Sequence, residues 1–208
     1  MPPTFSGGKR HESSTKSMSI VLFLGRSVKE YIENGADKTK ELINSGTIRC
    51  ASCFQPMARH SSYKREIKES GQEIRITIVW CRKCKIWHAL LPDFLLHNKH
   101  YSGNEIESVV ADSAEAVPVS QVETEASEAT VRRWIRQISE RVRRAISIFK
   151  LLFGRDGQAI NEVAIEAGPA YSELEQILEM APSTIRYSGN KLGLANLWLG
   201  TSSMNAFI

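Results

Sequence analysis

The chain contains four cysteines, arranged as two Cys-x-x-Cys pairs: Cys50 with Cys53, and Cys81 with Cys84. Thiolates at this spacing bind zinc, because the two residues inside each pair form a tight turn that points both sulfurs at one ion. Residues 54–80 separate the pairs, which suits a hairpin that runs out and back. The spacing therefore predicts a four-cysteine zinc ribbon that binds one Zn²⁺ ion.

Such a site is expected to be structural. Four thiolates complete the tetrahedral shell, so no position remains for a reactive water, and the metal contributes folding free energy on the order of 10 kcal/mol. Disulfides are one alternative, but residues 1–18 lack the apolar run of a secretory signal. A redox-active pair, the other alternative, would be single and would begin a helix. The nearby His60 and His88 are expected to stay outside the metal shell.

A strand pattern lies between the two cysteine pairs. The stretch "IRITIVW" at residues 74–80 places three isoleucines and Trp80 on one face of a predicted strand. Gly71 supplies the turn before it, because glycine adopts a positive φ without strain. Trp80 and Trp87 are expected to cover the small core that a ribbon builds.

Two helices are predicted after the ribbon. One begins near Ser102, a break follows at Pro118, and Ser127 is the N-cap of the second helix. A short helix, a tight connection and the stretch "SEATVRRWIRQI" predict a helix-turn-helix, whose second helix enters the major groove of DNA. The alternative is an amphipathic bundle helix with a solvated basic face. In either case one apolar stripe is formed by Val131, Trp134, Ile135, Ile138, Val142, Ala145, Ile146, Phe149 and Phe153.

Charge is sorted along the sequence into blocks. The net charge is +4 overall, with +6 in residues 49–99, −7 in residues 100–130 and +7 in residues 131–155. Two basic blocks favour binding to a polyanion, although a charge run can also be a solvated face. The candidate DNA contacts are Ser127, Thr130, Arg132, Arg133, Arg136 and Arg143 on the helix, and Arg59, Lys64, Arg65, Arg82, Lys83 and Lys85 on the ribbon.

The remaining segments complete a predicted α+β fold. Upstream of the ribbon, residues 20–24 predict a short strand, and the helix that follows is interrupted near Gly35. Near the C-terminus, residues around Ala164 and Gly168 have the pattern of a second helix-turn-helix, but its glutamates would repel phosphate, which favours a structural helical pair or a protein contact. The predicted divisions are a disordered tail at 1–18, a strand and helix packing on the ribbon at 19–48, the zinc ribbon at 49–99, the helix-turn-helix with its long basic helix at 100–153, and a C-terminal helical region at 154–208.

A resemblance to a known family is carried by the order of "IVLFLGRSVKEYIENG", "CASC", "YKRE", "CRKCKIWHALLPDFLL", "YSGNEI" and "TVRRWIRQ". Residues 19–140 resemble the zinc-ribbon plus helix-turn-helix proteins of bacterial transposons and insertion elements, a family known largely as a domain of unknown function. The resemblance implies a bacterial, mobile-element-associated DNA-binding protein, with zinc on the four cysteines. Glu125 stands where such a motif usually has its turn glycine.

The sequence thus predicts a non-catalytic, zinc-stabilised protein that binds double-stranded DNA as an accessory, targeting or regulatory factor of a mobile element. The three acidic metal ligands and long α/β region of a transposase core are not evident, so part of a transposase enzyme is a less favoured reading. The alternative is an adaptor that recruits a transposase or polymerase. A homo-oligomer is a further expectation. Apolar runs fall short of the roughly 20 residues of a spanning helix, so we expect a cytoplasmic protein, on the nucleoid when DNA-bound.

Overall fold

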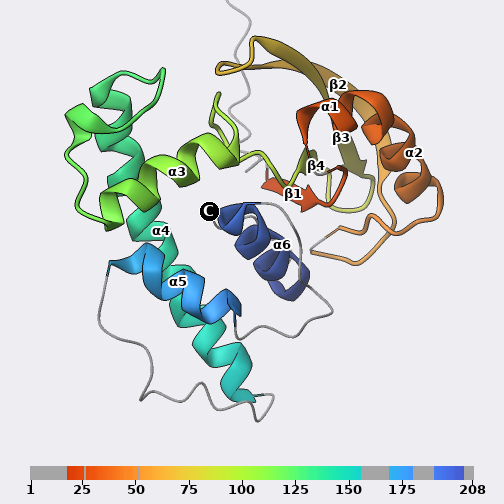
Figure 1. Ribbon diagram of the computed structural model, residues 1–208. Coiled ribbons are helices and arrows are strands. Elements are labelled where there is room, and N and C mark those ends of the chain that lie inside the picture. Colours follow the sequence, from red (N-terminus) through yellow and green to blue (C-terminus); the bar gives the residue numbers. More distant parts are fainter. Residues whose placement is uncertain (1–17, 26, 51, 156–168, 180–189, 204–208) are drawn as a thin grey trace, which may run out of the picture.

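A four-stranded sheet and a group of helices form the two sides of the molecule, as the computed structural model shows (Figure 1). The structure describes residues 18–25, 27–50, 52–155, 169–179 and 190–203. The expected α+β class, with four clustered cysteines, is confirmed. The expected tail, apart from its last residue, lies outside the described residues, and so do Ala164 and Gly168.

The sheet is built around the predicted hairpin. Its strands are β1 (Met18–Leu22), β2 (Ala58–Ile67), β3 (Gln72–Cys81) and β4 (Ile86–Pro92), in the order β1-β4-β3-β2. β3 is antiparallel to both β2 and β4, whereas β1 runs parallel to β4. Gly71, in the β2–β3 turn, has φ +61°, as the predicted turn requires. The upstream strand begins two residues earlier than the sequence predicts.

The interruption predicted near Gly35 is a change of helix type. Elements α1 (Val28–Glu30), η1 (Tyr31–Gly35) and α2 (Ala36–Asn44) follow one another, and η1 is a π-helical turn. The ring of Tyr31 occupies the space where a Cβ on Gly35 would lie, and the Tyr31 hydroxyl donates to the carbonyl of Arg75 at 2.8 Å. The wide turn therefore fastens this helical segment to β3.

Two buried clusters join the upstream segment to the sheet. One lies beside the cysteines, where Ile48, Met57, Val79 and Leu90 pack together with partly buried Leu42 of α2. The other is formed by Leu24, Tyr31, Ile67, Ile74, Ile76, Leu91, Phe94 and Leu95. Because each cluster contains side chains from 19–48 and from 49–99, these two segments share their hydrophobic cores.

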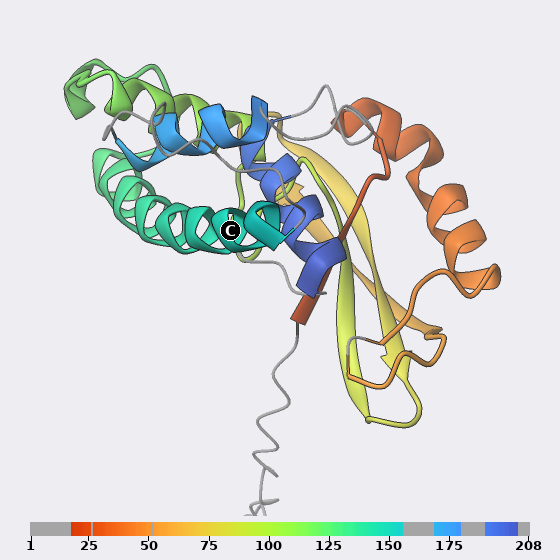
Figure 2. The ribbon, with the colours of Figure 1, turned by 90° about the horizontal axis from the view of Figure 1, so that it is seen from below.

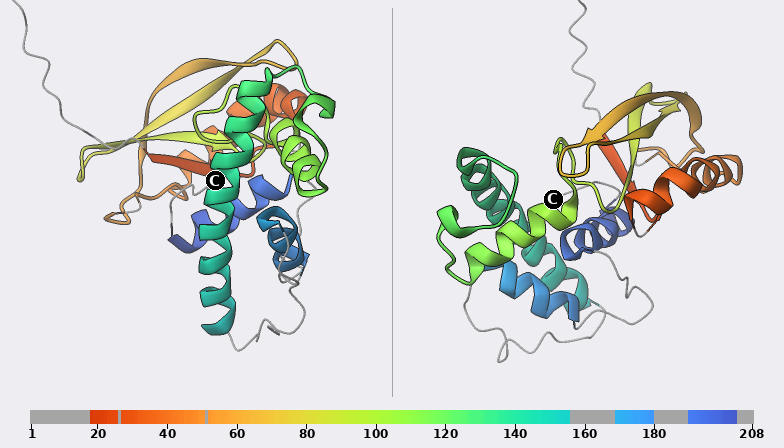
Figure 3. Two further views of the ribbon diagram at one scale, coloured as in Figure 1. Left: turned by 90° about the vertical axis from the view of Figure 1, so that its left-hand side faces the viewer. Right: turned by 45° about the horizontal axis from the view of Figure 1, so that its top comes forward.

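The helical side is organised around one long helix. Its elements are α3 (Gly103–Ala114), the 3₁₀ turn η2 (Val119–Gln121), α4 (Glu128–Arg155), α5 (Ala170–Glu179) and α6 (Lys191–Ser203). Figure 3 shows α4 as a long rod beside α3 and α5. The hydroxyls of Ser102 and Ser127 accept from backbone amides of the following turn, which confirms the predicted N-cap at Ser127 and the predicted helix start near Ser102. The side chains of the α4 stripe are buried at Val131, Trp134, Ile138, Val142, Ala145, Ile146 and Phe149.

The connection between α3 and α4 differs from the prediction. Residues 115–127 join the two helices and contain η2, so the connection is much longer than the three or four residues of a helix-turn-helix turn. Thr124 donates to Glu105 of α3 at 2.5 Å, which holds this long connection against the first helix. The prediction of a tight connection was therefore wrong. Pro118 precedes a separate 3₁₀ turn, so the chain does not pass directly from α3 into α4.

Helix α6 lies between the sheet and the other helices (Figures 1 and 2). Gly193 packs directly against the backbone carbonyl of Asp93, so a Cβ at Gly193 has no room. The amide of Leu192 donates to the Glu107 carboxylate of α3 at 2.9 Å. These contacts join α6 to both sides of the molecule. Among the residues that the structure describes, no helix has the length and apolar character needed to cross a membrane.

Candidate functional site

The two Cys-x-x-Cys segments are each followed by the same hydrogen bond and the same left-handed residue. The amide of Phe54 donates to the carbonyl of Cys50 at 2.8 Å, and the amide of Lys85 donates to the carbonyl of Cys81 at 2.9 Å. Both donors adopt left-handed backbone angles, with φ 58° for Phe54 and 59° for Lys85. The loop before β2 therefore directs the sulfurs of Cys50 and Cys53 toward the site, and the β3–β4 turn directs those of Cys81 and Cys84 toward it.

The four cysteine sulfurs gather at one point. All four lie within 4.8 Å of one another, and the sulfurs of Cys53 and Cys81 are 3.5 Å apart. A tetrahedral ion with metal–sulfur bonds of about 2.3 Å, the zinc value, separates its ligand sulfurs by about 3.8 Å. The donor set therefore fits a metal ion. Neither His60 nor His88 belongs to this group, as the sequence predicts.

Ionisation of these thiols is strongly unequal without a cation between them. Burial would raise the pKa of Cys81, but hydrogen bonds from the Cys84 amide and from neighbouring thiols outweigh it and lower the pKa to about 7. Hydrogen bonding to Cys53, together with burial, raises the pKa of Cys84 to about 12. Four thiolates at this separation repel one another, so they require a bound cation to coexist.

A second feature is a cleft between α4 and residues 97–101, which follow the sheet. It has a volume of about 680 Å³. We name it the basic cleft, because its lining contains the basic side chains Lys68, His97, Lys99, His100, Arg133 and Arg141. Its other lining residues are neutral: Asn98, Tyr101, Ser127, Thr130, Trp134 and Gln137. Among the described residues that line it there is no carboxylate, so none of these neutralises the charge of the basic side chains.

The predicted helix contacts divide between two stripes of α4. Ser127, Thr130 and Arg133 line the basic cleft. Arg132, Arg136 and Arg143 are exposed and do not line it. With about 100° between successive residues, these three arginines lie roughly a third of a turn away from the cleft stripe. Arg132 instead pairs with Glu128 at 3.2 Å.

The predicted ribbon contacts are more scattered. Arg59, Arg82, Lys83 and Lys85 are exposed around the cysteine end of the sheet. Lys64 is exposed and pairs with Glu73 at 2.6 Å. Arg65 is different, because its guanidinium is buried and donates to the backbone carbonyl of Leu96 at 3.0 Å. Arg65 thus braces the segment that leads into the basic cleft.

Several cleft residues are absent from the sequence-based prediction. Lys68, His97, Lys99, His100 and Arg141 line the cleft, yet they come from three separate stretches of sequence. The sequence shows the basic charge of residues 49–99 and 131–155, but it does not indicate that residues 97–101 lie against α4. The Lys99 ammonium spans the two parts directly, because it donates to Gln137 of α4 at 2.6 Å.

The crowding of positive charge in the cleft changes its ionisation. Burial lowers the pKa of Lys99, and the guanidinium groups of Arg141 and Arg133 lower it further. Burial also lowers the pKa of His97, with added repulsion from Arg141 and Arg65. Since like charges are held together without an acidic partner among the lining residues, an anion entering the cleft would relieve this repulsion.

A pH-dependent loss of stability should follow from His97. Its pKa is lowered in the folded protein, so the unfolded chain binds the proton more readily, and the free energy of unfolding should fall as pH drops below about 6.5. Urea denaturation at pH 7.5 and 5.5 measures this loss. His97→Gln should lose less stability than the wild type over the same interval, whereas an equal loss would contradict the prediction.

The aromatic residues beside the cysteines lie differently from the prediction. Trp80 and Trp87 are cross-strand neighbours with ring centroids 4.1 Å apart, and both are partly exposed. Neither belongs to the buried clusters of the described residues or packs against one of them. The prediction that Trp80 and Trp87 cover the ribbon core was wrong, because Val79, Cys81 and Leu90 form that core on the opposite face of the sheet.

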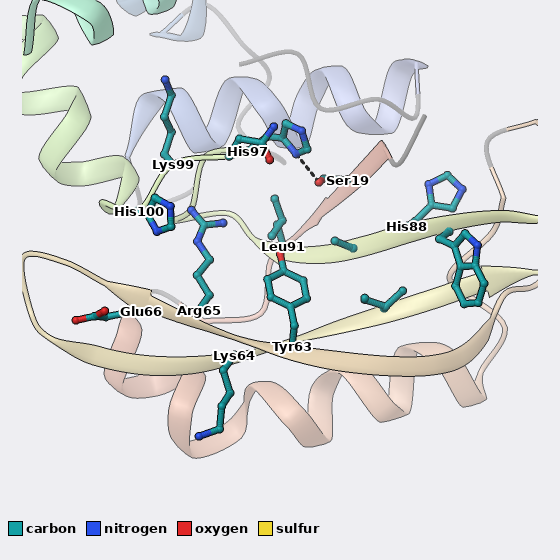
Figure 4. A pocket seen from close by; sticks show the side chains of 14 residues that line it. Ser19, Tyr63, Lys64, Arg65, Glu66, His88, Leu91, His97, Lys99 and His100 are labelled. Carbon is teal, nitrogen blue, oxygen red and sulfur yellow. Dashed lines mark hydrogen bonds between the residues drawn. The ribbon is translucent and has the colours of Figure 1, made fainter. Parts of the chain in front are cut away.

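That open face forms a second cavity, which we name the sheet pocket. It has a volume of about 590 Å³. Tyr63, Ile78, Trp87 and Ala89 contribute to its lining, and it shares residues 97–100 with the basic cleft. Figure 4 shows Tyr63 and Arg65 rising from β2 toward His97 and His100, while Lys64 points to the other side. His97 is positioned by a 2.7 Å hydrogen bond between its Nδ1 and the Ser19 hydroxyl.

A family described as "Domain of unknown function (DUF6431)" matches residues 50–134. The match therefore runs from the first metal-site cysteine to Trp134 in α4, and it includes both the metal site and the segment that forms one wall of the basic cleft. No curated protein and no solved structure matches the chain.

Proposed function

We propose that this protein is a non-catalytic DNA-binding protein whose fold is stabilised by one zinc ion. The observation that supports this most is the basic cleft, where six basic side chains face one another without a carboxylate in the lining. Repulsion between these basic side chains destabilises the protein without a ligand, and the phosphate groups of a DNA backbone would offset that repulsion.

The hydrogen-bonding groups of the cleft also suit phosphate. The hydroxyls of Ser127 and Thr130 and the guanidinium of Arg133 lie together at the first turns of α4. Hydroxyls, guanidinium groups and the positive end of a helix dipole all bind phosphate oxygens. In this proposal the cleft contacts the DNA backbone, and Arg132 and Arg136 on the other stripe contribute only general attraction.

Zinc has a supporting role in the proposal. Cys50, Cys53, Cys81 and Cys84 would hold the ion, and their four thiolates would leave no coordination position open for chemistry. The ion would fix the loop before β2 to the β3–β4 turn. This in turn keeps the sheet rigid behind the segment that carries His97 and Lys99.

The test compares two double variants that remove equal charge from the same helix. Arg133→Ala with Arg141→Ala should weaken binding to a blunt 20-base-pair duplex by about tenfold or more. It should also reduce the salt slope of log K by about 2, because each lost phosphate contact removes about 0.9. Fluorescence anisotropy at several salt concentrations gives both values.

The matched control is Arg132→Ala with Arg136→Ala, which leaves the basic cleft intact. This control should lose much less affinity than the cleft variant. Equal losses in the two variants would show that only net charge matters, and would overturn the assignment to the cleft. A wild-type protein that binds no duplex at low salt would overturn the proposed function itself.

The wider role is proposed on the resemblance alone. A zinc-stabilised DNA-binding protein of this kind would act as an accessory, targeting or regulatory factor of a bacterial mobile element. The expected genomic observation is a transposase or recombinase gene beside this one. Its consistent absence beside close relatives of this gene would contradict the mobile-element role and leave the DNA-binding proposal intact.

A further inference from the structure

We infer that the sheet pocket binds unpaired bases of a DNA strand whose backbone continues into the basic cleft. The inference rests on the proposed function, and it adds a second ligand class, single-stranded DNA next to duplex. Two cavities carry it: the sheet pocket on the open face of β2, β3 and β4, and the basic cleft beside it.

The first observation is an aromatic row on a sheet face that the described residues leave partly exposed. The ring of His60 lies 3.8 Å from that of Trp87, and Trp87 lies 4.1 Å from Trp80. Tyr63, on the neighbouring strand, is 40% exposed. The rings in this row are tilted against one another, with interplanar angles of 66° between His60 and Trp87 and 42° between Trp87 and Trp80. A base of any sequence would stack on a ring face that stays exposed at the margin of the row, since every base has a π face.

The second observation is the position of basic side chains at both ends of this row. At the cysteine end, the Lys85 ammonium lies 5.8 Å from the centroid of the Trp80 ring. At the other end, the sheet pocket shares His97, Lys99 and His100 with the basic cleft. Alternating aromatic and cationic groups match the alternating bases and phosphates of a single strand.

The third observation is the continuity of the two cavities. Residues 97–100 form a common wall, so a strand leaving the basic cleft reaches the sheet pocket without crossing a buried core. In Figure 4 Lys99 points away from Tyr63, whereas His97 and His100 lie on the side of the sheet pocket. The wall thus offers positive charge to both cavities. The described lining of the sheet pocket also contains the Glu66 carboxylate, so the excess of positive charge lies on the side of the basic cleft, where the strand backbone would run.

The experiment uses the full-length protein with two fluorescein-labelled probes. One is a blunt 20-base-pair duplex, and the other is the same duplex with a six-thymidine overhang. The wild type should bind the overhang probe about tenfold more tightly than the blunt one, because each stacked base contributes substantially. Tryptophan emission should fall when the overhang probe is added, since Trp80 and Trp87 lie on the proposed platform.

Trp87→Ala should remove this preference and leave the affinity for blunt duplex unchanged. Phe54→Ala is the matched control, because Phe54 is an aromatic residue that is 61% exposed and lies outside the sheet pocket. It should retain the tenfold preference. Tyr63→Ala provides a second variant on the platform, which should also lose much of the preference.

The outcomes separate the two proposals. Equal wild-type affinity for the two probes, with duplex binding present, would overturn this inference and leave the proposed function standing. Loss of blunt-duplex binding in Trp87→Ala, with a normal circular dichroism spectrum, would also overturn it, because the pocket would then serve duplex DNA. Absence of binding to either probe would overturn both.

Discussion

Cys81→Ser is expected to abolish metal binding and with it the cooperative unfolding of the sheet. Cys81 is fully buried and its sulfur lies 3.5 Å from that of Cys53, so serine removes one of four ligands from a closed site. Structural zinc contributes on the order of 10 kcal/mol, which is comparable to the whole stability of a domain this size. Inductively coupled plasma mass spectrometry should find one zinc per wild-type chain and none in the variant, and calorimetry should show the loss of the transition.

Arg82→Ala is the control for this experiment. Arg82 lies inside the same Cys-x-x-Cys turn but is exposed, so its loss should leave zinc content and melting temperature nearly unchanged. A strong chelator added to the wild type should reproduce the effect of Cys81→Ser. A Cys81→Ser protein that melts normally, or a wild-type protein that is purified without metal, would refute a structural zinc site.

Trp134→Ala is expected to have the next largest effect. Trp134 is 2% exposed, and its ring meets that of Tyr101 edge to face with centroids 4.8 Å apart. Truncation of a buried tryptophan costs about 3–5 kcal/mol, because the surrounding side chains cannot fill the cavity. Urea denaturation should measure that loss. Since Trp134 and Tyr101 both line the basic cleft, DNA affinity should fall as well.

A conservative substitution at Trp134 tests whether the lost stability comes from the lost aromatic packing or from any change at this position. Trp134→Phe keeps an aromatic ring against Tyr101 and should lose clearly less stability than Trp134→Ala. If Trp134→Ala lost less than about 1 kcal/mol, the position would behave as a surface site and the packing of α4 described above would be wrong.

Local chemistry explains what the sequence predicted well. Gly71 adopts the positive φ that a turn glycine permits, and the hydroxyls of Ser102 and Ser127 cap their helices. The two Cys-x-x-Cys turns bring four sulfurs together. Each of these features depends on a few neighbouring residues, so the pattern of residue types was sufficient to find it.

The errors come from features that depend on distant residues. Alternation along residues 74–80 separated the two faces of β3, but it did not show which face would be covered. At the cysteine end of β3 the cover lies on the side of Val79, where Leu42 of α2 and Ile48 pack, and Trp80 is left on the other side. Farther along the same strand, Ile74 and Ile76 are buried on the Trp80 side, so each face is covered over part of its length. Likewise the basic cleft arises only when residues 97–101 meet α4. Tertiary contacts of this kind leave no local signature.

The parallel pairing of β1 with β4 also constrains the order in which the chain folds. Met18 lies opposite His88, so the first strand of the sheet has no partner until β4 has been synthesised. Pairing over so long a separation is slow, because the chain loses loop entropy before the contact forms. The β2–β3–β4 meander and its cysteines need only local contacts, so metal capture should precede the arrival of β1. On the ribosome, the strand made first would be added to the sheet last.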